Sequence, residues 1–127
     1  MSELIVYTVP GRPKSWQRRA PMRKKNGELV FVSRRSRGDE AAKAAHQLAA
    51  NVAMRGKRGH DMSGTWAIEV TAYYPDNRTG DVDRIAGLPL DALQGIVYEQ
   101  DRQVVSLAVH RHVDAERPRT EVRVWRA

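Results

Sequence analysis

The sequence predicts an α/β (α+β) fold, in which a small mixed sheet of about four to five strands packs with two main helices. Runs rich in β-branched and aromatic residues alternate with helix-like runs, an order typical of mixed sheets. A hydrophobic content of 41% over 127 residues indicates a globular core. That length suits one core and not two, so we expect a single domain over residues 1–127.

The amino-terminal third predicts a strand followed by a basic arm. Residues 3–9 read ELIVYTV, and Pro10-Gly11 ends this strand. The arm covers residues 11–37, where the apolar residues 29–32 follow the turn signal Asn26-Gly27. We therefore expect a hairpin within the arm.

The middle of the chain predicts a helix and then a second strand. The helix should run from about Glu40 to Met54, with Ser36 or Asp39 as its N-cap. We expect His46 at the surface or boundary of this helix. Residues 65–74 alternate as a half-buried strand does.

A second helix should cover residues 90–94, with Pro89 in its first turn and Gly95 at its end. The pattern leaves open whether this helix reaches back to Asp83, because a proline inside it would remove a hydrogen bond. Residues 103–113 and 120–125 are the last predicted strands. His110 and His112 share a face of the first of these, and we expect both to be solvated.

Charge is distributed unevenly along a chain whose formal net charge is +7. Residues 11–37 hold ten Lys or Arg against one acid, Glu28. Such a surface attracts a polyanion. Trp16 lies among these bases, and we expect it to anchor the arm to the core and not to stack on a nucleic-acid base. The predicted DNA-binding residues are Arg12, Lys14, Arg18, Arg19, Arg23, Lys24, Lys25, Arg34, Arg35 and Arg37.

Residues 76–101 form an acidic segment with six acids against two bases. Carboxylates held close together raise one another's pKa values unless a cation lies between them. Oxygen ligands suit Mg²⁺ or Mn²⁺. The candidate ligands are Asp81, Asp83 and Asp101, with Asp91 as a further ligand or an orienting residue. The simpler interpretation is that these acids cap helices and line loops.

The acidic segment resembles the RusA family of Holliday-junction resolvases, which are small dimeric endodeoxyribonucleases. The resemblance rests on Asp81-Val82-Asp83, Asp91-Ala92-Leu93 and Asp101-Arg102-Gln103-Val104, with residues 9–15 resembling the family's opening strand and its exit. It implies a homodimer that cuts four-way DNA junctions in recombination and repair, using a metal ion held by Asp81, Asp83 and Asp101.

Two positions depart from the family pattern. Arg84 stands where the family has Asn, and Gly87 stands where it has a catalytic Lys. In a continuous helix, Gly87 would leave a gap where that Lys projects. The bases that could neutralise the developing charge in its place are Arg84, Arg102 and Lys14.

Other function classes are disfavoured by composition. The chain has no Cys, which removes disulfides, thiolate zinc sites and thiol nucleophiles. No apolar run approaches the ~18 residues of a membrane span, so we expect a cytoplasmic protein with no membrane and no small-molecule cofactor. The alternatives to an enzyme are a junction- or duplex-binding module without turnover and a basic structural component of a nucleoprotein assembly.

Overall fold

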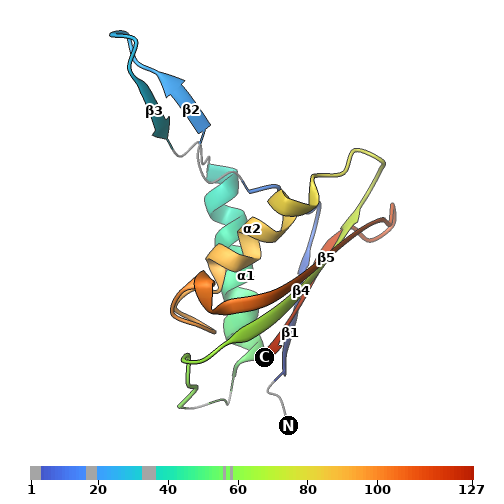
Figure 1. The fold of residues 1–127 in the computed structure, drawn as a ribbon. Helices are drawn as coiled ribbons and strands as arrows, with labels where there is room; N and C mark the ends of the chain where they lie inside the picture. The colour runs from blue at the N-terminus through green and yellow to red at the C-terminus, as the bar shows by residue number, and fades with distance from the viewer. Residues whose placement is uncertain (1–3, 17–19, 33–36, 56, 58) are drawn as a thin grey trace.

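One mixed sheet and two helices make up the body of the protein (Figure 1). The computed structural model describes residues 4–16, 20–32, 37–55, 57 and 59–127. The sheet has the strand order β1-β6-β4-β5, built from β1 (Leu4–Pro10), β4 (Trp66–Tyr74), β5 (Val104–Val113) and β6 (Arg119–Arg126). Strands β4 and β5 are parallel, and the other pairs are antiparallel. The predicted α+β class is confirmed.

Both helices lie on the same face of the sheet (Figure 1). Helix α1 (Arg37–Ala53) packs on β1 and on helix α2 (Val82–Ala92), and α2 packs on β4 and β5. Alternate strand residues face these helices. The buried residues of the core include Ile5, Trp66, Ile68, Val70, Tyr74, Ile85, Leu93, Val122 and Val124.

Helix α1 begins at Arg37, three residues before the predicted start, and ends at Ala53. Asp39 therefore lies in its first turn with Glu40 and is not the N-cap. Acids in the first turn are favoured by the helix dipole, and Asp39 also pairs with Lys14 at 3.3 Å. The other predicted cap, Ser36, lies outside the described residues.

Helix α2 resolves the question that the sequence left open, because it is continuous from Val82 to Ala92. Pro89 lies inside it, so its predicted place in the first turn is wrong. The proline is fully buried, as are its neighbours Ile85 and Leu88. Burial of this apolar face offsets the cost of the missing hydrogen bond.

The basic arm contains the expected hairpin, formed by β2 (Ala20–Arg23) and β3 (Leu29–Val32). The amide of Lys24 donates to the carbonyl of Glu28 at 2.8 Å, and Gly27 supplies the positive φ that the turn requires. Figure 1 shows the hairpin extending away from the sheet and helices. It forms a separate two-stranded sheet.

The sheet face opposite the helices carries polar side chains. His110 is exposed there and its Nε2 lies 3.2 Å from Glu69, which is also 3.5 Å from Arg123. His112 is exposed and its ring packs on Tyr73, with centroids 5.4 Å apart. The prediction that both histidines are solvated is confirmed. Among the described helices, none is both long and apolar enough to cross a membrane.

His46 is buried, and its predicted place at the surface or boundary is wrong. Its Nδ1 forms a hydrogen bond with the Tyr7 hydroxyl at 2.9 Å, and the two rings meet edge to face. The periodicity of α1 could not reveal this, because the partner belongs to a strand 39 residues away. Burial lowers the pKa of His46 from 6.5 to about 4.

This burial predicts an acid-sensitive stability. The unfolded chain binds a proton at His46 below pH 6.5, whereas the folded chain binds one only near pH 4, so acid favours unfolding between these values. The free energy of unfolding should fall by up to about 3 kcal/mol as the pH falls through this window. Urea unfolding of the wild type and of His46→Gln, whose amide oxygen can still accept from Tyr7, measures the difference. Equal losses in both proteins would contradict the assignment.

Candidate active site

Asp81 and Asp83 stand together at the start of helix α2. Asp81 is the N-cap residue in an extended conformation, Asp83 lies in the first turn, and both are exposed. The carboxylate of Asp81 makes no capping hydrogen bond. Its oxygens are therefore not committed to the helix, and the helix dipole stabilises the negative charge of the pair.

Asp91 and Asp101 are brought together at the other end of α2 by Gln94. The Gln94 side-chain amide donates to Asp91 at 3.1 Å, and the Asp101 backbone amide donates to the Gln94 side-chain oxygen at 3.2 Å. Asp91 also forms an ion pair with Lys43 of α1 at 3.2 Å. Asp101 opens the short 3₁₀ helix η1 (Asp101–Gln103) that leads into β5.

We call Asp81 with Asp83, and Asp91 with Asp101, the two acid pairs; Gln94 joins the second through the carboxylate of Asp91 and the backbone amide of Asp101. Eight helical residues separate Asp83 from Asp91, a rise of about 12 Å. In the described part of the chain, no three His, Asp or Glu side chains gather as a metal site. The meeting of Asp101 with Asp81 and Asp83 remains a prediction. The chemistry of each pair fits a hard divalent cation, since all the donors are carboxylate oxygens.

The position of Gly87 is closed by Trp16. A Cβ atom at Gly87 would lie 3.3 Å from Cδ1 and 3.4 Å from Cβ of Trp16, which is 3% exposed. The Trp16 amide donates to the carbonyl of Arg84 at 3.1 Å. The predicted anchoring role of Trp16 is confirmed, and the gap expected beside Gly87 does not exist. The sequence could not show this, because the indole comes from a segment about 70 residues earlier.

Restoring a lysine at this position should therefore destabilise the fold. Gly87→Lys places a side chain against a buried indole, and overpacking of this kind costs about 1–3 kcal/mol. The expected result is a lower urea midpoint and no gain in nicking rate. The double variant Gly87→Lys with Trp16→Ala should recover part of the loss. Unchanged stability with faster nicking would show that the indole moves aside to admit a family-like lysine.

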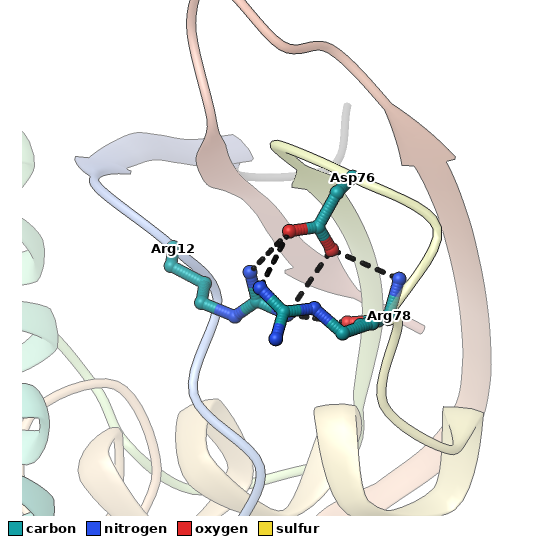
Figure 2. Close-up of polar contacts among 3 residues, drawn as sticks. All are labelled: Arg12, Asp76 and Arg78. Carbon is teal, nitrogen blue, oxygen red and sulfur yellow. Dashed lines mark hydrogen bonds and ion pairs between the residues drawn. The ribbon is translucent and has the colours of Figure 1, made fainter.

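Arg12 and Arg78 converge on Asp76 beside the start of α2, as Figure 2 shows. Arg12 lies 3.3 and 3.4 Å from the two Asp76 oxygens and also donates to the carbonyl of Arg78. The Arg78 guanidinium and backbone amide donate to Asp76 at 3.1 and 2.9 Å. These hydrogen bonds, from Arg78 and then from Arg12, hold the pKa of the Asp76 carboxyl well below its usual range. Asp76 therefore orients two cations at all physiological pH values.

The structure places only some of the predicted DNA-binding residues. Arg23, Lys24 and Lys25 are exposed on the hairpin, and Arg37 is the first residue of α1. The remaining predicted bases of the arm lie outside the described residues: Arg18, Arg19, Arg34 and Arg35. The sequence did not reveal Asp76 and Arg78 as site residues, because the segment that holds them looks like an ordinary turn after a strand.

The candidate charge-neutralising bases lie at different ends of the site. Arg84 is exposed beside Asp83, and Arg102 is exposed beside Asp101. Lys14 pairs with Asp39, although it also lines a cavity that includes Arg12 and Gly80. Each acid pair therefore has one arginine next to it in sequence.

Comparison with known proteins identifies the family of this chain. The family model for the endodeoxyribonuclease RusA matches residues 10–125, which takes in the four acids, the hairpin, β4, β5 and all of β6 but its last residue. No curated protein matches the chain. A match over nearly the whole length shows that this chain belongs to the RusA endodeoxyribonuclease family.

Proposed function

We propose that the protein is a homodimeric endonuclease that nicks four-way DNA junctions with Mg²⁺ or Mn²⁺, in DNA recombination and repair. The observation that carries the proposal is the exposed pair Asp81 and Asp83, which stands at a helix start beside a cationic loop in a chain of the RusA family. A DNA-binding module gains nothing from bare carboxylates there, since they repel phosphate.

The separation of the acid pairs supports a site shared between two chains. Within one chain, the helical rise from Asp83 to Asp91 is about 12 Å, and Gln94 joins Asp91 to the backbone amide of Asp101. A twofold axis that brings the start of α2 next to Asp101 of the partner subunit does so twice, so it generates two equivalent sites. Two such sites match the paired nicks that junction resolution requires.

In this shared site, Asp81 and Asp83 of one chain and Asp101 of the partner subunit would hold the metal ion. When bound, the ion polarises the scissile phosphate and lowers the pKa of a bound water. Asp91 orients the second acid through Gln94. Lys43 balances the charge of Asp91.

The arginines next to the acids supply the positive charge that the family assigns to a lysine. Arg84 follows Asp83 in the chain, and Arg102, which follows Asp101, would belong to the partner subunit that supplies that acid. Both are exposed and can approach a pentavalent phosphate, whereas Lys14 already pairs with Asp39. Preorganised cations at such a position lower the barrier by several kcal/mol.

The hairpin provides a second contact to the DNA. Arg23, Lys24 and Lys25 are exposed at or next to its turn, and the hairpin extends away from the sheet (Figure 1). Contacts of this kind neutralise backbone phosphates without reading bases. A dimer would present two hairpins, which suits a branched substrate with twofold symmetry.

A synthetic four-way junction tests the proposal. Incubation with Mg²⁺ should give symmetric paired nicks that are absent in EDTA. Binding without nicks would instead favour a junction- or duplex-binding module without turnover. The observation that favours this alternative is Gly87, which stands where the family has a catalytic lysine. If the protein neither binds nor nicks the junction, the remaining alternative is a structural component of a nucleoprotein assembly.

A further inference from the structure

A cavity of about 450 Å³ lies between the loop after β1 and the loop that leads into α2. Its walls combine three basic residues, three residues that carry a hydroxyl (Ser15, Tyr74 and Thr79) and a glycine. The residues that matter here are Arg12, Lys14, Ser15, Tyr74, Arg78 and Gly80. Asp81 follows Gly80 directly, so the cavity adjoins the first acid pair.

The Tyr74 hydroxyl is the unusual feature of this cavity. Tyr74 is 1% exposed, and its hydroxyl has no hydrogen-bond partner among the described residues. A buried hydroxyl without a partner destabilises the fold. A ligand oxygen that accepts a hydrogen bond from this hydroxyl would remove the penalty.

Gly80 lies directly against the hydroxyls of Ser15 and Tyr74. A Cβ atom at Gly80 would lie 2.5 Å from Oγ of Ser15 and 2.7 Å from the Tyr74 hydroxyl oxygen. Both hydroxyls therefore converge beside Gly80, where the Cβ atom of any larger residue would collide with them. Two O–H donors that converge in this way suit a ligand oxygen.

The charges around the cavity select an anion. The Arg12 guanidinium lies over the Tyr74 ring, 5.6 Å from its centroid, and Asp76 fixes it beside Arg78 (Figure 2). Together with Lys14, three bases face two acids, Asp76 and Asp39, so the cluster keeps a positive charge. Cations and hydroxyl donors in one small cavity match a tetrahedral phosphate.

We propose that this cavity binds one phosphodiester of the DNA backbone, with the hydroxyls of Ser15 and Tyr74 donating to its oxygens and Arg12 and Arg78 balancing its charge. The inference rests on the proposed function for the identity of the ligand as DNA. The bound phosphate fixes the register of the strand relative to Asp81 and Asp83. The cavity is thus a positioning site beside the cutting site.

Tyr74→Phe tests the proposal, because it removes only the hydroxyl. The probe is the dinucleotide TpT, which has one phosphodiester, titrated in EDTA while the amide resonance of Gly80 is followed by NMR. Affinity should fall about tenfold in Tyr74→Phe, whereas the urea midpoint should stay the same or rise. Tyr73→Phe, on the opposite face of the same strand, should change neither property and serves as the matched control.

Inorganic phosphate is the second arm of the experiment. Binding of TpT that is lost in Tyr74→Phe supports the proposal, whether or not inorganic phosphate also binds. Binding of inorganic phosphate alone would overturn it by assigning the cavity to a free anion. Equal TpT affinity in wild type and Tyr74→Phe, or a lower urea midpoint with unchanged affinity, would also overturn it.

The outcome is separable from that of the proposed function. TpT binding in EDTA does not require cleavage. If the protein binds TpT but cuts no junction, the phosphate-site proposal stands and the proposed nuclease activity fails. If Tyr74→Phe cuts junctions and binds TpT as well as the wild type does, the phosphate-site proposal fails and the nuclease proposal stands.

Discussion

Asp83→Asn should lower the rate of junction nicking by at least about 10³-fold while junction affinity in EDTA stays within about twofold. Asparagine keeps the size of the side chain and removes the charge that holds the metal ion, which is worth several kcal/mol of transition-state stabilisation. Asp83 is exposed, so the fold should not change. Single-turnover nicking with Mg²⁺ and fluorescence anisotropy without it measure the two quantities.

Glu99→Gln is the matched control for this variant. Glu99 is an exposed acid of the same acidic segment that belongs to neither acid pair. Its rate should remain within about threefold of wild type, since the charge it removes interacts with the site only through solvent. A similar loss in both variants would mean that overall charge, and not a metal ligand, controls the rate.

Subunits carrying Asp83→Asn and subunits carrying Asp101→Asn should restore activity when they are mixed. Each homodimer is inactive, because both of its sites lack one ligand. In a mixed dimer one shared site combines both substitutions, and the other site is intact. Random exchange at equal concentrations should therefore recover about one quarter of the wild-type sites, as single nicks.

The opposite arrangement gives a different result. If each site were built within one chain, every site in the mixed dimer would carry one substitution, and mixing would recover nothing. Denaturing and refolding the two variants together ensures exchange. The same procedure applied to Asp83→Asn alone is the control for recovery by refolding.

Much of the fold follows from local patterns in the sequence. The strands alternate because one sheet face is covered by helices, and the hairpin turn requires the positive φ of Gly27. The extent of α2 was not predictable, since a buried proline is tolerated there only because tertiary packing compensates for it. His46 was misplaced for the same reason, as Tyr7 reaches it from a distant strand.

The acids were identifiable from their clustering, but their arrangement was not. Sequence distance gave no sign that Gln94 would join Asp91 to Asp101. The packing beside Gly87 could not be predicted from the sequence either, because the side chain of Trp16, from the basic arm, occupies that space. Such contacts between distant segments depend on the folded topology and leave no periodic signal in the chain.

A crystal soaked in Mn²⁺ tests the shared site most directly, since the anomalous signal of the ion marks its position. We expect one ion per chain, bound between Asp81 and Asp83 and within about 2.5 Å of Asp101 of the partner subunit. An ion bound by acids of one chain alone, or no ion near Asp81 and Asp83, would contradict it.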